Sequence, residues 1–321
     1  YEKIEGVDVI RCPIWVPKKP KGISRIIHLL SFVITSFPPL VKNIFWGPNL
    51  LILIAPSLLS APIVLIFKLF LKKKKFKSWI HIQDFNCDTS HAEFAGKSTD
   101  TYGSFNADSA TLHHCNSVAS IAAGSFSGAT SGADIMGVAY DAGILFSSVS
   151  NLGSNANQFD QWKNATAQAA NRTGMIVQNN SWGLGVSCGA AAGTSADNVC
   201  EGYEIDNVLA VKSSAGTTAD QTFAYYATGN VANATDASNA VASMNSFQNH
   251  GVIVWANSNS SLSDSDLHSG LPVLFSQLDE AWITAVNINV KGASGSETYA
   301  IKGAYCGQAA AFCMGADGWG I

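Results

Sequence analysis

The chain has 321 residues, of which 47% are hydrophobic and 13% are charged, and its formal net charge is −4. This composition allows a sizeable buried core, and the length suits two domains. The charge is unevenly distributed, since residues 1–84 hold 13 basic and 4 acidic residues, a net charge of +9, whereas residues 85–321 carry −13. All but one of the 9 prolines also precede Asp84. A single domain with one basic face does not account for both differences, so we expect two segments, 1–84 and 85–321.

The basic segment opens with a predicted strand and a predicted helix. Residues 7–13 have the pattern of a strand that ends in a turn. Apolar residues then recur at helical spacing from Ile23 to Phe37, and Pro38-Pro39 should stop this helix.

The second half of the basic segment has two interpretations. The apolar run 50–67, followed by the lysines 72–75, raises the question of a membrane span. Because Pro56 and Pro62 interrupt the run, we favour a βαβ unit instead. Its strands would cover 50–54 and 77–82, and its helix 60–71.

Residues 9–20, with Arg25 and His28, and the ending Trp79-Ile80-His81-Ile82-Gln83-Asp84 resemble the N-terminal domain of bacterial exopolysaccharide glycosyltransferases. The resemblance covers residues 1–84 and implies a partial Rossmann-like segment. The family's second domain, which would hold the nucleotide sugar, has no counterpart here, so this segment alone should not transfer sugar. Solvated surface charge accounts for most of its basic residues, with contact to an anionic membrane surface as the alternative.

The acidic segment contains short apolar runs separated by alanine-rich stretches, a pattern that predicts a parallel sheet buried on both faces. The expected strands are 143–146, 175–179, 251–256 and 281–286, and the expected helices are 159–171 and 231–249. The fold class predicted for the chain is therefore α/β, a parallel sheet flanked by helices, preceded by the partial Rossmann-like βαβ segment.

The 7 cysteines give a suggestion of export. The pairs Cys188/Cys200 and Cys306/Cys313 are close enough in sequence to bridge short loops in an exported protein. For Cys306/Cys313 we expect a disulfide, with two reduced core thiols as the alternative. The odd total leaves at least one thiol free.

Several motifs follow one another through the acidic segment. They are Asp84 with Asp88–Gly96, His114-Cys115-Asn116-Ser117-Val118-Ala119, Asn179-Asn180-Ser181-Trp182-Gly183, Val252–Ala256 with Asn257-Ser258-Asn259, and Cys306–Ala316. In this order they resemble the subtilisin-like serine proteases, or subtilases, over nearly all of residues 85–321. The chain departs from the family at Phe85-Asn86, where Thr/Ser-Gly is usual, and at Cys115-Asn116, where Gly-Thr is usual.

The resemblance implies a role for each residue. His114, at the start of a helix, would be the base that activates a serine, and Asp84 would hold its tautomer and stabilise the imidazolium. Asn259 would donate a hydrogen bond to the oxyanion, and Ser181-Trp182-Gly183 would bind an extended peptide. Each residue also has a purely structural alternative. Asp84 could be an ordinary carboxylate at a strand end, where it also fits the glycosyltransferase pattern. His114 could be an ordinary histidine at a helix start, next to His113, and Asn259 could be a loop asparagine.

The family's nucleophile lies in Gly-Thr-Ser-x-Ala, downstream of the segment 306–316, and the printed sequence ends before such a motif. Gly193-Thr194-Ser195-Ala196 imitates it but precedes Asn259, so we reject it. We therefore expect a subtilisin-like serine endopeptidase that is truncated before its nucleophile and inactive as given. The alternatives are a peptide-binding pseudoprotease and a glycosyltransferase fragment. The join near Asp84 is either a real fusion or an artefact of two partial reading frames.

The expected partner is a polypeptide substrate, without nucleic acid, and the basic segment 1–84 is the part that would contact a membrane surface. No cofactor is certain, and calcium is the one that the resemblance allows. The resemblances place the protease part outside the cell or in the cell envelope, and the glycosyltransferase-like part at the cytoplasmic face of the membrane.

Overall fold

A computed structural model describes residues 2–4, 7–13, 15, 31, 34–39, 42, 79–84, 87–103, 109–125, 136–148, 158–183, 204–210, 217–259, 263–292 and 296–318. The chain divides into two compact units, Tyr1–Phe76 and Lys77–Ile321. This division precedes the boundary at 84/85 that the sequence suggests. The reason is that strand β3 (Trp79–Asp84) pairs along its length with two strands of the second unit.

The first unit begins with an antiparallel pair, β1 (Glu2–Ile4) and β2 (Val7–Val9). The predicted helix stop at Pro38-Pro39 is wrong, because residues 34–39 are all helical. Proline fixes φ near the helical value, so both residues keep a helical backbone although each lacks an N–H.

The predicted strand 50–54 and helix 60–71 lie outside the described residues. Within the described part of the chain, no helix has the length and apolar character needed to cross a membrane.

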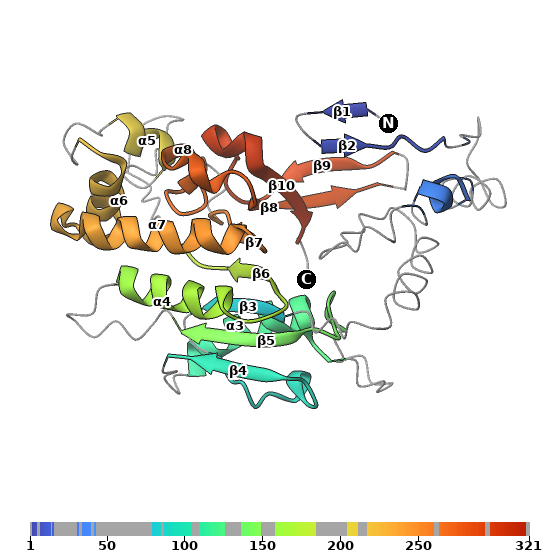
Figure 1. The fold of residues 1–321 in the computed structure, drawn as a ribbon, viewed down its shortest axis with the longest axis horizontal. Helices are drawn as coiled ribbons and strands as arrows, with labels where there is room; N and C mark the ends of the chain where they lie inside the picture. The colour runs from blue at the N-terminus through green and yellow to red at the C-terminus, as the bar shows by residue number, and fades with distance from the viewer. Residues whose placement is uncertain are drawn as a thin grey trace. The chain divides into compact units, whose positions relative to one another are not determined.

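The second unit is built on one sheet with the strand order β10-β8-β7-β6-β3-β5-β4 (Figure 1). All neighbours in this order are parallel, and β9 adds an antiparallel strand to β8. The remaining strands are β4 (Thr99–Tyr102), β5 (Gly143–Ser148), β6 (Met175–Asn180), β7 (Val252–Ala256), β8 (Trp282–Lys291), β9 (Thr298–Ile301) and β10 (Cys313–Asp317). The parallel sheet confirms the α/β fold class predicted for the acidic segment, whereas the predicted βαβ segment before it stays a prediction.

Helices accompany the strands in the order that the sequence predicts. They are α3 (Ser109–Ala123), α4 (Gln158–Ala170), α5 (Ile205–Ala210), α6 (Ala219–Thr228), α7 (Ala234–Gln248) and α8 (Leu271–Leu274), with short 3-10 turns at Ala92–Phe94, Val231–Asn233, Ser276–Leu278 and Gly307–Phe312. Local chemistry sets the bounds of α6. Thr218 and Gln221 form a capping box at its start, and Gly229 ends it at φ 72°, where a glycine is favoured.

The two faces of the sheet are covered by different helices. Side chains alternate along β3. Ile80 and Ile82 therefore pack on one face, in a cluster with residues of α3, and Trp79 packs on the other face, against a cluster with residues of α4, α6 and α7. Helices α4 and α7 lie against each other over β6 and β7 (Figure 1).

His81 is a buried polar residue of β3. Its ring nitrogens bond Gln178 Oε1 at 3.2 Å and Ser147 Oγ at 2.7 Å, on the two neighbouring strands. Burial lowers the pKa of His81 to about 4, so the ring is neutral at physiological pH. These contacts fix β3, and with it the position of Asp84 at its carboxyl end.

Candidate active site

Asp84 and His114 form an ion-pair contact at the carboxyl end of the sheet. His114 Nδ1 donates to Asp84 Oδ2 at 2.9 Å and lies 3.1 Å from Oδ1. The carboxylate side chain is fully buried, whereas the imidazole is 54% exposed. The second ring nitrogen, Nε2, therefore belongs to a ring that a reactant can approach.

The pKa of His114 is raised above its ordinary value, first because Asp84 accepts a hydrogen bond from the ring. Burial acts against this effect, and the charge of Asp84 adds to it. A histidine in this setting can take a proton from a hydroxyl and keep the resulting charge beside a carboxylate.

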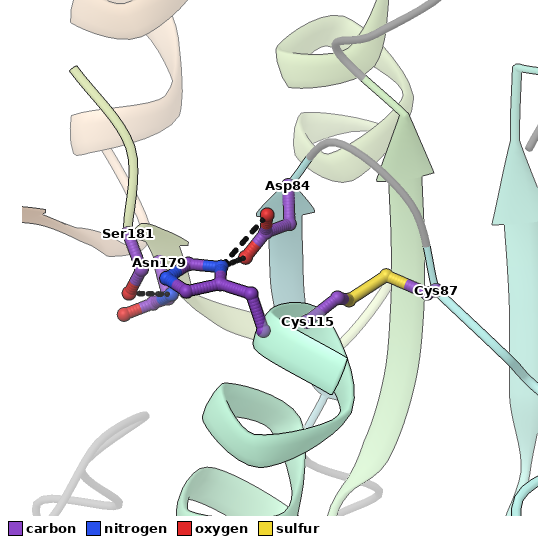
Figure 2. Close-up of polar contacts among 6 residues, drawn as sticks. Asp84, Cys87, Cys115, Asn179 and Ser181 are labelled. Carbon is purple, nitrogen blue, oxygen red and sulfur yellow. Dashed lines mark hydrogen bonds and ion pairs between the residues drawn. A yellow bond between two sulfur atoms is a disulfide. The ribbon is translucent and has the colours of Figure 1, made fainter. Parts of the chain in front are cut away.

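The turn of α3 that carries His114 is linked to the segment after Asp84 at three successive residues. His114 contacts Asp84, Cys115 forms a disulfide with Cys87, and Asn116 Oδ1 accepts a hydrogen bond from the Asp88 N–H at 3.0 Å. Figure 2 shows the disulfide together with the Asp84 carboxylate. The two departures from the family pattern, Cys115 and Asn116, thus have structural partners in the segment 87–88.

The sequence places His114 at the start of its helix, and this prediction is wrong. Helix α3 begins at Ser109, before His114. Ala110 and Leu112 are strong helix formers, and they extend the helix toward the N-terminus.

Residues 181–183 follow β6 at the same edge of the sheet as Asp84. Asn179 Nδ2 donates to Ser181 Oγ at 2.9 Å, a contact drawn in Figure 2. The Trp182 carbonyl accepts a hydrogen bond from Trp255 Nε1 at 2.7 Å. This carbonyl therefore faces the core.

Aromatic rings pack against the Trp182 ring of this segment. The Trp182 ring lies 4.8 Å from that of Trp162, 5.0 Å from that of Trp255 and 5.4 Å from that of His268. His268 is buried, and burial lowers its pKa to about 3. Residues 181–183 thus rest on closely packed, uncharged aromatic rings.

Asn259 lies just beyond the end of β7, and its side chain is exposed. Its neighbour Asn257 is buried, donating to the Ala304 and Tyr305 carbonyls at 3.1 and 3.0 Å and accepting from Ser269 Oγ at 2.9 Å. Because β3, β6 and β7 are adjacent and parallel, Asp84, Ser181 and Asn259 lie at the carboxyl ends of three neighbouring strands.

The other predicted residues are placed as follows. Cys306 and Cys313 are joined by a disulfide around the 3-10 turn Gly307–Phe312. Cys188, Cys200 and the segment 193–196 lie outside the described residues, as do Phe85-Asn86. Among the described cysteines, Cys12 is a free thiol. In the described part of the chain, no three His, Cys, Asp or Glu side chains gather into a metal site.

Sequence reasoning missed the disulfide Cys87–Cys115, although the sequence holds a signal for it. Cys87 follows Asp84 closely and Cys115 is adjacent to His114. If Asp84 and His114 meet, the two cysteines must also come near each other.

Three solved structures resemble the chain. They are the prenylagaramide maturation protease PagA (TM-score 0.43, 13% identity, 76% of this chain and 64% of that one), Sphericase (0.39, 19%, 72% and 61%) and the nisin leader peptidase NisP from Lactococcus lactis (0.37, 16%, 67% and 57%). The chain thus spans less than two thirds of the length of each.

A curated relative matches a smaller part. The chain is 37% identical over 89 residues to a colanic acid biosynthesis glycosyl transferase, WcaI, of Escherichia coli (strain K12). The match covers 27% of this chain and 21% of that protein, so the chain spans about a fifth of the relative.

The comparison with family models covers far more of the chain. The model of the subtilase family, Peptidase_S8, matches residues 70–318. This range includes β3, α3, β6 and β7, the elements that bring Asp84, His114, Ser181 and Asn259 to one edge of the sheet. The chain belongs to the subtilase family.

Proposed function

We propose that the chain is the peptide-binding and general-base part of a subtilisin-like serine endopeptidase. The contact between the buried Asp84 carboxylate and the half-exposed His114 ring is the observation that carries this proposal. A serine hydroxyl is a poor nucleophile until a base takes its proton, and a carboxylate behind the imidazole favours that transfer.

The proposed reaction follows from these positions. His114 Nε2 takes the proton of a serine hydroxyl while the serine oxygen bonds to the carbonyl carbon of the scissile peptide. Asp84 stabilises the imidazolium, which then returns the proton to the leaving amine. The Asn259 amide donates to the oxygen that becomes negative, an interaction worth about 10²–10³ in turnover in comparable enzymes. Water hydrolyses the acyl-enzyme in a second pass through the same groups.

This reaction needs a serine nucleophile, and the printed sequence has no Gly-Thr-Ser-x-Ala motif after the segment 306–316. We therefore propose that these 321 residues bind peptides and do not cleave them. Treatment with a fluorophosphonate probe should leave the purified chain without an adduct by mass spectrometry. A labelled serine would contradict the proposed inactivity and would identify the nucleophile directly.

Peptide binding along 181–183 has its own test. A fluorescent, extended peptide should bind saturably in an anisotropy titration of the wild-type chain. Gly183→Pro should abolish this binding because proline removes an N–H that a peptide strand would use, whereas Gly183→Ala keeps the N–H and should retain it. Unchanged binding in Gly183→Pro, with the fold intact by circular dichroism, would exclude strand addition at this segment.

Localisation and calcium belong to the same proposal. The disulfides Cys87–Cys115 and Cys306–Cys313 support an oxidising location, either secreted or in the cell envelope. Calcium binding is proposed from the family alone, and a titration followed by the melting temperature tests it. Contact of the basic segment 1–84 with an anionic membrane is tested by vesicle sedimentation.

A further inference from the structure

Strand β9 is an exposed strand at the margin of the sheet. It lies beside β8 and, among the described residues, pairs with no other strand (Figure 1). All 4 of its residues are exposed, and two of them are large and apolar, Tyr299 at 67% and Ile301 at 42%. Edge strands are commonly protected by charge or proline, because their open N–H and C=O groups pair readily with another strand. β9 contains neither a charged residue nor a proline.

The hydrogen bonds to β8 identify the backbone groups that face the open edge. The Lys302 N–H donates to the Asn287 carbonyl at 2.8 Å, and the two residues continue the register of the antiparallel pair. Residues of such a ladder alternately bond to the partner strand and point away from it. Ala300 therefore also bonds to β8, whereas the N–H and C=O groups of Tyr299 and Ile301 point away from β8.

The side chains of these two residues form one apolar surface with β8. Tyr299 lies opposite Val290, and Ile301 lies opposite Ile288. Because side chains alternate along a strand, all four lie on the same face of the hairpin. Val290 and Ile288 are partly exposed. A further strand beside β9 would bond the outward backbone groups and would also cover this apolar surface.

The sequence of β9 makes a second copy of the chain a suitable partner. In an antiparallel pair, two opposite residues must both point toward the partner strand or both point away from it. A two-fold axis at Ala300 meets this condition and places Tyr299 of each copy opposite Ile301 of the other. Pairs of an aromatic and a β-branched residue stabilise sheets. An axis at Tyr299 would instead place Ile301 opposite Glu297, and an axis at Ile301 would place Tyr299 opposite the buried Gly303.

We propose that two copies of the chain associate by antiparallel pairing of their β9 strands, with the two-fold axis at Ala300. Each Tyr299–Ile301 pair then exchanges both of its N–H···O=C hydrogen bonds, and the apolar surfaces of the two hairpins become continuous. An interface this small is transient, so we expect a dissociation constant on the order of 10–100 µM. This inference does not depend on the proposed function.

A cysteine at residue 300 tests the position of the axis. The two Ala300 residues would face each other in a non-hydrogen-bonded pair, with Cα atoms about 4.5 Å apart, which a disulfide can bridge. Thr298→Cys is the matched control, because its two copies would lie more than about 13 Å apart. Both variants also carry Cys12→Ser, since Cys12 is a free thiol.

Under mild oxidation, Ala300→Cys should give at least about tenfold more disulfide-linked dimer than Thr298→Cys. A non-reducing gel measures the yield, and mass spectrometry of a digest identifies the link between the two residues 300.

Sedimentation velocity over a concentration series measures the reversible association of the full chain. Tyr299→Lys should weaken it at least about tenfold, because a charge would be buried against Ile301 of the other copy. Tyr225→Lys makes the same change at an exposed tyrosine of α6 and should have no effect. Ile301→Pro removes an outward N–H without breaking a bond to β8 and should abolish association, whereas Ile301→Val should retain it.

Two results would overturn the inference. One is a wild-type chain that stays monomeric over the whole concentration series. The other is association through a different surface, shown by dimers that persist in Tyr299→Lys or by equal cross-linking at residues 298 and 300. Circular dichroism checks that each variant is folded, and Tyr299→Lys decides the question if Ile301→Pro does not fold.

Discussion

The protonation of His114 is governed by Asp84, because the carboxylate accepts the ring's Nδ1–H. Asp84→Asn should lower the pKa of His114, since the hydrogen bond and the charge that raise it are weakened or lost together. A titration of the ring C–H signals by NMR measures this, with His114→Gln to assign the resonance. Asp88→Asn is the matched control, since the Asp88 carboxylate accepts from Ser90 and not from His114.

The same pair makes folding stability depend on pH. The folded pKa of His114 lies above its ordinary 6.5, so the contribution of the pair is fully present below that pH and is lost as the pH rises through the folded pKa. Asp84→Asn should reduce the change in unfolding free energy with pH over this range. A His114 pKa that does not change in Asp84→Asn would contradict the assigned contact.

Asp266 predicts a second pH dependence. Burial raises its pKa from 3.8 to about 6, against the hydrogen bonds from the Ser269 and His268 N–H groups. Its contribution to stability is therefore present below pH 3.8 and lost as the pH rises to about 6. At about 1.4 kcal/mol per pKa unit, Asp266→Asn should gain roughly 3 kcal/mol in unfolding free energy relative to wild type between about pH 4 and pH 7. Urea unfolding across this range measures the difference, and a constant difference would refute it.

Some functional residues can be identified from the sequence and others cannot. Asp84 and His114 are identifiable because their motifs occur in the family's order. Asp266 was not singled out, since its burial is set by the fold and no local pattern contains it. Asn257 is similar: it adjoins Asn259 in one turn-like run, and only its burial and its bonds to Ala304 and Tyr305 separate a structural asparagine from a candidate functional one.

Among the secondary-structure elements, α3 and the segment after β3 behave as one piece because the disulfide Cys87–Cys115 joins them across 28 residues. Cys87→Ala with Cys115→Ala should reduce the unfolding free energy by roughly 3–4 kcal/mol, the loop-closure effect expected for a loop of this size. Denaturant unfolding without reductant measures the loss.

Cys12→Ala provides the control for this prediction, because Cys12 is a free thiol in the other unit and its replacement should change little. The double variant should also broaden or shift the His114 resonances, since His114 is adjacent to Cys115. Equal stability of the double variant and wild type would show that Asp88–Asn116 and Asp84–His114 suffice to hold the helix.

The elements themselves were predictable where apolar pattern and length agree. The predicted strands 143–146 and 175–179 and the helix 159–171 appear as β5, β6 and α4 with small changes of bounds. The start of α3 was not predictable in this way, because the motif fixes the position of His114 but carries no information on the helical turn before it.

For the whole molecule, the place of β3 decides which part folds alone. Residues 77–321 should fold without the preceding unit, because β3 and all its partner strands are retained. Residues 85–321 should not, since removal of β3 separates β5 from β6 at the middle of the sheet and deletes Asp84. Near-ultraviolet circular dichroism and a cooperative melting transition distinguish the two fragments. A folded 85–321 fragment would restore the boundary that the charge and proline patterns suggest.

That boundary illustrates a limit of composition. Trp79–Asp84 follows a lysine-rich stretch and matches the glycosyltransferase pattern, so the sequence assigns it to the basic segment. Strand pairing assigns it to the second unit, and pairing depends on residues far along the chain.

The order of the strands has a consequence for the speed of folding. β3 comes first in the sequence of its unit but lies inside the sheet, and the contacts of His81 span 66 residues to Ser147 and 97 residues to Gln178. During synthesis, the edge of this strand that pairs with β6 stays unpaired until more than a third of the unit has emerged. Contacts between distant residues slow folding because the intervening chain must first be ordered. We therefore expect slow refolding from denaturant. We also expect aggregation to compete with refolding, because β3 exposes an unpaired edge until its partner strands have folded.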